Sequence, residues 1–146
     1  MKFWIPLAGI AIVALGAYLL WPSKSPYVMR TISVDNIYFQ VEVADTEPLR
    51  EQGLGSRGSL KAGHGMLFVF DTPASWGIWM KDMRFPIDIL WAREDGTVIT
   101  VVHNVSPDTY PLALYPQTPD AKYVLEVPSG AAKEIREGSR MVINEE

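Results

Sequence analysis

The chain contains 146 residues, of which 48% are hydrophobic and 21% charged, a composition that fits one globular domain with an additional apolar segment. Its formal net charge of −4 argues against a nucleic-acid partner and against a polybasic contact with lipids, because both need local positive potential. The lack of cysteine excludes a disulfide, a thiolate metal site and a lipid-attachment cysteine.

The amino-terminal segment FWIPLAGIAIVALGAYLLWP, residues 3–22, carries no charged side chain. At about 1.5 Å per residue, a helix of this length spans the roughly 30 Å hydrocarbon core of a bilayer. Trp4, Tyr18 and Trp21 lie toward its two ends, where interfacial aromatic residues occur. Residues 1–22 are therefore predicted to form a transmembrane anchor, through which the protein contacts the membrane.

A buried core helix is the weaker alternative, because such a helix rarely runs this long without a polar face. A cleaved signal peptide is the stronger alternative, because Lys2 supplies a positive amino end and Ala14 with Gly16 can form a cleavage site. The apolar run is, however, longer than the roughly 7 to 15 residues typical of a signal sequence. The basic residues that flank the apolar segment on its two sides are nearly equal in number and do not fix its orientation in the membrane. The resemblance of the segment to a signal sequence favours a domain on the outer side. We expect a single-pass protein of the cell membrane with an extracytoplasmic domain, periplasmic or at the cell surface, or a secreted domain if the segment is cleaved.

A short polar linker, residues 23–30, is expected between this segment and a domain that covers residues 31–146. The alternation of apolar and polar side chains in IYFQVEVA, residues 37–44, predicts a half-buried strand. Pro48 then begins a brief helical turn, which Gly53 ends. The apolar run MLFVF, residues 66–70, predicts a central strand buried on both faces.

Two further segments, IDILWAR at 87–93 and TVITVVHN at 97–104, flank a turn signal and predict a hairpin. If Asp95 and Gly96 form a two-residue loop, Asp88 lies directly opposite His103. A three-residue loop that also includes Glu94 shifts the register by one residue and separates the two side chains.

The remaining predicted elements are a strand at 122–127, a short helix at 131–137 and a last strand at 140–143. Strands dominate, and the regular alternation of strands and helices that is typical of a parallel sheet does not occur. We therefore predict a mainly β (α+β) fold, a small and mostly antiparallel barrel or sandwich with one or two short helices, preceded by the N-terminal transmembrane helix.

Six successive motifs resemble the signatures of the DUF192 (UPF0127, COG1430) family, in the right order over nearly the whole domain. They are Gly53-Leu54 with Arg57, GHGMLFVF at 63–70, WMKD at 79–82, FPID at 85–88, EDG at 94–96 and YVLEVPSG at 123–130. The resemblance implies a compact, mainly β domain of uncharacterised function, often preceded by a signal or an anchor. The chain departs from the family pattern at Gly55, where methionine is usual, and at Asp82-Met83, where Asn-Thr is usual.

The stretch GIWMKDMRFPIDILW, residues 77–91, carries the candidate site. In a strand over 77–81, Trp79 and Lys81 share one face, while Ile78 and Met80 share the other. A flat aromatic ring beside an ammonium group suits a cleft that holds a polar ring or an anionic group. Structural roles are the alternative: Trp79 as a core side chain, and Lys81 in an ion pair with a nearby aspartate.

The predicted cleft comprises Trp79, Lys81, Asp82, Asp88, Glu126 and His64. Glu126 can instead cap the following helix or accept from a backbone nest, and His64 can be an exposed turn residue. Two histidines, at 64 and 103, and the carboxylates do not have metal-site spacing, and no nucleotide, hydrolase or metalloprotease motif occurs, so no metal, cofactor or catalytic residue is predicted.

Three functions follow from these residues. The first is a noncatalytic module that binds a polar envelope small molecule or an envelope protein segment in the cleft. The second is a hydrolase of envelope polymer with Asp82 and Asp88 as its carboxylate pair, and the third is a scaffold that docks on another membrane protein. The lack of enzyme motifs favours the first.

Overall fold

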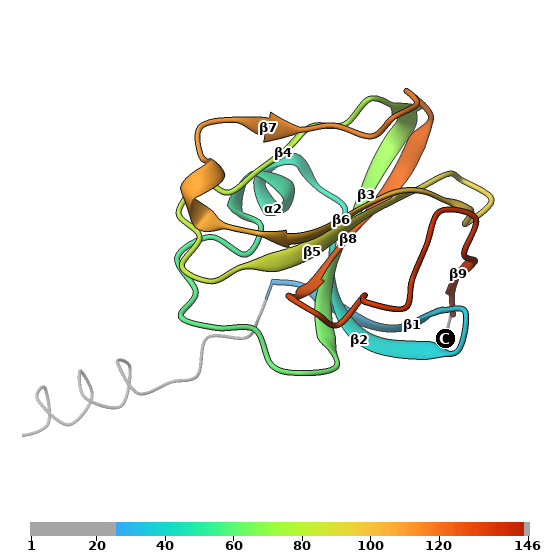
Figure 1. Ribbon diagram of the computed structural model, residues 1–146, viewed down its shortest axis with the longest axis horizontal. Helices are drawn as coiled ribbons and strands as arrows, with labels where there is room; N and C mark the ends of the chain where they lie inside the picture. Colours follow the sequence, from blue (N-terminus) through green and yellow to red (C-terminus); the bar gives the residue numbers. More distant parts are fainter. Residues whose placement is uncertain (1–25, 145–146) are drawn as a thin grey trace, which may run out of the picture.

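The computed structural model describes residues 26–144, which form two β-sheets and two short helices (Figure 1). The main sheet has seven strands in the spatial order β6-β5-β8-β3-β2-β1-β9. These are β1 (Val28–Val34), β2 (Ile37–Ala44), β3 (His64–Ala74), β5 (Ile87–Ala92), β6 (Val98–Val105), β8 (Ala121–Pro128) and β9 (Met141–Ile143). The short strands β4 (Ile78–Trp79) and β7 (Ala113–Leu114) form a separate ribbon, and the helices are α2 (Glu47–Gln52) and the 3-10 turn η1 (Pro107–Thr109).

All neighbouring strands are antiparallel except β2 and β3, which run parallel. Parallel neighbours need a crossover connection, and residues 45–63, which include α2, provide it. The two edges of the sheet meet through the bridge between Thr97 and Arg140, and the N–H of Met141 donates to the oxygen of Gly96. The predicted mainly β fold, mostly antiparallel and barrel-like, is therefore confirmed.

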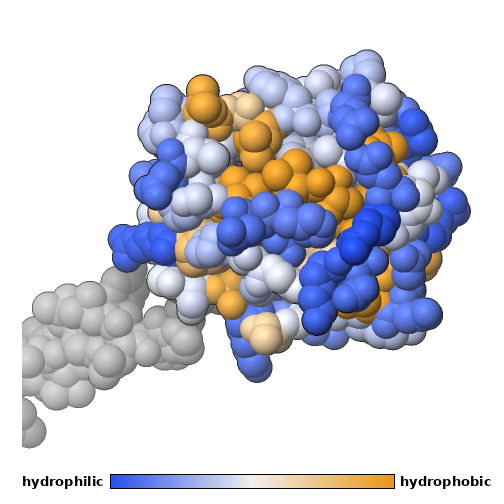
Figure 2. All heavy atoms as spheres, viewed as in Figure 1, coloured by the Kyte–Doolittle hydropathy of each residue, from blue (hydrophilic) through white to orange (hydrophobic). Residues whose placement is uncertain are grey.

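Each face of the sheet carries its own hydrophobic cluster. One cluster includes Ile32, Leu67 and Leu125 and is covered by Ala132 and Ile135 from the segment after β8. The other lies under α2 and the β4–β7 ribbon and includes Leu54, Met66, Phe68, Phe70, Ile78, Ile89 and Trp91. Hydrophobic side chains also reach the surface between the β4–β7 ribbon and β6 (Figure 2).

Most predicted strands are confirmed. Residues 66–70 lie in the middle of β3, between β2 and β8, and only Val69 among them is partly exposed. The linker predicted over 23–30 overlaps β1, which begins at Val28.

The helix predicted over 131–137 is wrong, because this segment forms successive turns. Asp88 accepts the N–H groups of Gly130 and Ala132, and the buried side chains of Ala132 and Ile135 pack against the sheet. These long-range contacts outweigh the local helix preference.

The β5–β6 hairpin combines both predicted registers. The N–H of Arg93 donates to the oxygen of Thr97, so Glu94 to Gly96 form a three-residue loop. A register shift between Trp91 and Ala92 then places Trp91 opposite Thr100, as in the two-residue alternative. A second register shift, between Ile87 and Ile89, falls at Asp88, whose Oδ2 lies 3.7 Å from Nδ1 of His103.

The predicted membrane anchor, residues 3–22, lies outside the described residues. Between Pro26 and Asn144, no helix is long and apolar enough to cross a bilayer.

Candidate functional site

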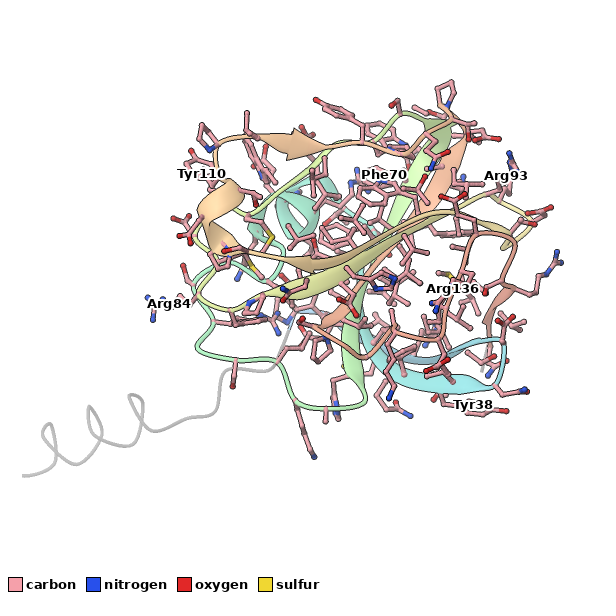
Figure 3. The ribbon with its side chains drawn as sticks, in the orientation of Figure 1. Tyr38, Phe70, Arg84, Arg93, Tyr110 and Arg136 are labelled. Carbon is pink, nitrogen blue, oxygen red and sulfur yellow. The ribbon has the colours of Figure 1, made fainter. Side chains whose placement is uncertain are left out.

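A cavity of about 220 Å³ opens between α2, β4 and the face of the main sheet. Phe70 lies beneath the β4–β7 ribbon, on the sheet side of this cavity (Figure 3). Most of the wall is apolar and comes from Leu54, Phe68, Phe70, Ile78, Trp79 and Met83. The charged residues are Glu47, Arg50, Glu51 and Lys81 from the surrounding elements and Glu126 from the sheet.

Close backbone packing forms one wall of the cavity. The N–H of Ser56 donates to the oxygen of Asp82, at 2.8 Å, and holds the loop after α2 against the loop after β4. A Cβ atom on Gly55 would lie only 3.3 Å from the oxygen of Lys81, so glycine permits this approach. Asp82 itself has a positive φ of 57°, which turns the chain away from β4.

Trp79 and Lys81 lie on the outer side of β4, as the alternation predicts, while Ile78 and Met80 are buried. The indole of Trp79 is 51% exposed, so it is not the core side chain of the structural alternative. The ammonium of Lys81 lies 5.6 Å from the centre of the indole ring, a cation–π distance. Tyr110 contacts the ring of Trp79 edge-on, with 6.3 Å between centroids.

Glu126 is the buried polar residue of the cavity. It sits on β8 between Met66 of β3 and Ile89 of β5, both fully buried, and is itself only 5% exposed. Among residues 26–144, its carboxyl group has no hydrogen-bond or ion-pair partner. Burial raises the pKa of Glu126 to about 8, and the positive charge of Arg57 opposes this shift only in part. At neutral pH the carboxyl group is therefore mainly protonated.

Arg57 and Glu42 form a two-pronged ion pair on the same side of the sheet. The two terminal guanidinium nitrogens, Nη1 and Nη2, donate to the carboxylate oxygens of Glu42 at 2.7 Å. The hydrogen bonds to Glu42 raise the pKa of Arg57, despite its partial burial. Because these donors of Arg57 are hydrogen-bonded to Glu42, Arg57 acts on Glu126 only through the electrostatic effect of its charge.

Asp88 does not belong to this cavity, contrary to the predicted grouping with Trp79 and Lys81. Its side chain points to the opposite face of the sheet and is fully buried. There it accepts the N–H groups of Asn104, Gly130 and Ala132, at 2.8 to 3.0 Å. Ile87 and Ile89 face the cavity side, and strand alternation sends Asp88 to the other side. The backbone-nest role considered for Glu126 thus belongs to Asp88.

The other two predicted cleft residues lie outside the cavity lining. His64 begins β3 near the turn, and its Nδ1 lies 3.2 Å from the oxygen of Ala62. Asp82 lies in the loop beside the cavity, where its backbone oxygen accepts the N–H of Ser56. Within the described part of the chain, no group of three His, Asp or Glu side chains is placed to hold a metal ion.

The family model described as "Uncharacterized ACR, COG1430" (DUF192) matches residues 30–143. The chain belongs to the DUF192 family. No curated protein matches this DUF192 chain.

Two crystal structures of bacterial proteins resemble the DUF192 domain. One is of a putative transcription regulator from Sinorhizobium meliloti 1021, with 30% identity and a TM-score of 0.76, over 83% of this chain and 98% of that one. The other is of a protein of unknown function from Novosphingobium aromaticivorans, with 25% identity and a TM-score of 0.75, over 83% of this chain and 91% of that one.

Sequence reasoning placed Trp79, Lys81 and Glu126 at the site, and the structure brings these three to one cavity. It assigned Phe68 and Phe70 only to a core strand and did not find the Arg57–Glu42 pair. The even-numbered side chains of β3 share one face, so strand alternation predicts that Phe68 and Phe70 lie side by side. Which face bordered an opening depends on α2 and β4, which pack there from other parts of the chain.

Proposed function

We propose that this DUF192 domain is a noncatalytic binding module whose ligand occupies the cavity between α2 and β4. The observation that carries the proposal is the carboxyl group of Glu126, buried at an apolar cavity without a partner in the described structure. The surrounding apolar wall makes a hydrogen bond to this carboxyl group stronger than the same bond in water. A ligand that makes this hydrogen bond therefore gains binding free energy there.

The cavity also has the composition of a small-molecule site. Such sites combine mostly apolar and aromatic walls with a few polar groups that orient the ligand. Here Phe68, Phe70 and Ile78 provide the apolar wall, and Glu126 provides the polar group.

The hydrolase alternative receives no support from the geometry. Asp82 and Asp88 would have to flank one scissile bond, but Asp88 faces the other side of the sheet. All three of its hydrogen-bond donors are backbone N–H groups, so Asp88 has a structural role.

A fragment screen on the purified protein, read by NMR, tests the binding proposal. We expect some fragments to shift the amide signals of residues that line the cavity. Binding should weaken in Glu126→Leu, which removes the polar group, and persist in Glu134→Gln, which removes an exposed charge elsewhere. No cavity fragment, or equal binding to Glu126→Leu, would contradict the proposal.

We further propose that residues 3–22 keep the domain attached to the outer side of the cell membrane. The uninterrupted apolar length of this segment supports the proposal. The attached protein should resist carbonate extraction from membranes and retain its first residues in amino-terminal sequencing. A mature protein that begins at Ala17 or later would instead indicate a cleaved signal peptide.

A further inference from the structure

We propose that the cavity takes a neutral, planar ring with an amide-like edge, one N–H donor beside one carbonyl acceptor, which pairs with the carboxyl group of Glu126. This inference rests on the proposed binding function and specifies the chemistry of its ligand.

The surroundings of Glu126 set the hydrogen bonds that a ligand must make. Its strand neighbours across the sheet, Met66 and Ile89, are apolar and fully buried. A protonated carboxyl group has one O–H donor and one adjacent carbonyl acceptor. An amide edge has the complementary pair, so it can satisfy both oxygens of Glu126 at once.

The protonation state of Glu126 agrees with a neutral ligand. Desolvation raises its pKa to about 8 although Arg57 lies near enough to oppose the shift. The charge of Arg57 is itself taken up by the two-pronged pair with Glu42. This environment disfavours an ion at Glu126, so a ligand that needs no ion pair fits it best.

The outer lining of the cavity adds no net charge. Glu47 and Glu51 are acidic, whereas Arg50 and Lys81 are basic. Both hydrogen bonds of Arg50 go to backbone oxygens, of Asp45 and Val69. A charged ligand would lose hydration on entry without a surplus of opposite charge to compensate.

Size and shape favour a single ring. The volume of about 220 Å³ exceeds the roughly 150 Å³ of an apolar protein cavity that accommodates benzene. The rings of Phe68 and Phe70 form part of the wall, and aromatic walls pack well against a flat ring.

Three probes with the same ring and nearly the same shape separate the possible head groups: benzamide is neutral, benzamidinium is cationic and benzoate is anionic. Binding to the full-length chain is measured by NMR at pH 6.5 and pH 9.5. We expect benzamide to bind best at pH 6.5. Its affinity should fall roughly tenfold or more at pH 9.5, because ionised Glu126 no longer donates a hydrogen bond.

Two variants separate hydrogen bonding from packing. Glu126→Gln keeps a donor and an acceptor but cannot ionise, so benzamide should bind it equally at both pH values. Glu126→Leu keeps the approximate volume but has no polar atom, so benzamide binding should be lost. A merely structural Glu126 would not produce this pattern.

Preferred binding of benzamidinium that strengthens as the pH rises through 8 would overturn the inference in favour of a cationic ligand. Preferred binding of benzoate would overturn it in favour of an anionic ligand, and benzamide binding without pH dependence would remove Glu126 from the recognition. If other fragments occupy the cavity and none of the three probes does, this inference fails while the binding function stands. If no fragment occupies it, both fail.

Discussion

Asp88 and Glu126 are buried carboxyl groups on neighbouring strands, β5 and β8, yet they lie in opposite environments. Asp88 faces one side of the sheet and accepts three backbone N–H groups. Glu126 faces the other side, toward an open cavity, and has no hydrogen-bond partner within residues 26–144. Burial alone therefore does not distinguish a structural acid from a binding acid. The partners of the group make the distinction, and the variants below test it.

Replacement of Asp88 should have the largest effect on stability. Asp88→Ala removes the acceptor of three backbone N–H groups, of which that of Ala132 is buried and those of Asn104 and Gly130 are part-buried, and a hydrogen bond to a carboxylate contributes about 1.5 to 3 kcal/mol. We expect the free energy of unfolding to fall by about 4 kcal/mol or more in urea titrations, and Asp88→Asn to show a smaller loss because one oxygen remains. The exposed acid Glu134, changed to alanine, serves as the control. A loss below about 1 kcal/mol for Asp88→Ala would show that the three hydrogen bonds do not hold the segment after β8.

Phe68→Ala tests the apolar wall on the side of Glu126. Phe68 is 4% exposed in the central strand β3, and truncation of a buried phenylalanine costs about 3 to 5 kcal/mol. We expect about 3 kcal/mol in the same titration, because the side chain already borders an open cavity. An unchanged urea midpoint would mean that this wall contributes little to the core.

Glu126 should make stability depend on pH in a direction opposite to that of most carboxylates. Its pKa is about 8 in the folded protein, against about 4.5 ordinarily, so between these values the folded state holds a proton that the unfolded chain has lost. Stability should therefore fall as pH rises from about 4.5 to about 8, by at most about 1.4 kcal/mol per pH unit, and level off above. Glu126→Gln should lack this contribution. Parallel pH profiles for the variant and the wild type would show that Glu126 is ionised in the folded state.

The contrast between the two acids was only partly accessible from the sequence. Strand alternation places the side chain of Glu126 on the other face of the sheet from its chain neighbours Leu125 and Val127. It likewise places Asp88 on the other face from Ile87 and Ile89. It does not reveal that the N–H groups of the turn after β8 fold back on Asp88, more than forty residues away in the chain. A helix-like pattern at 131–137 even conceals this contact.

The cavity residues show the same limit. The alternation at 77–81 correctly separates exposed Trp79 from buried Ile78, because it depends only on local geometry. The position of α2 over Phe68 depends on the parallel pairing of β2 with β3, a contact between distant segments. Sequence patterns thus indicate which face a side chain occupies, and the tertiary packing decides whether that face is sealed or open.

The smallest expected effect concerns the influence of Arg57 on Glu126. Arg57→Gln removes the positive charge that lowers the pKa of Glu126, so this pKa should rise above its wild-type value. Arg57→Lys keeps the positive charge, so the pKa of Glu126 should stay close to its wild-type value. The lysine cannot, however, make the two-pronged contact with Glu42. The carboxyl carbon signal of isotope-labelled Glu126, followed by NMR as the pH is raised, measures the shift directly. We expect a rise of less than about one pH unit, because the charge of Arg57 is already shared with Glu42. A midpoint that falls in Arg57→Gln would contradict the assignment of Arg57 as the positive charge that lowers the pKa of Glu126.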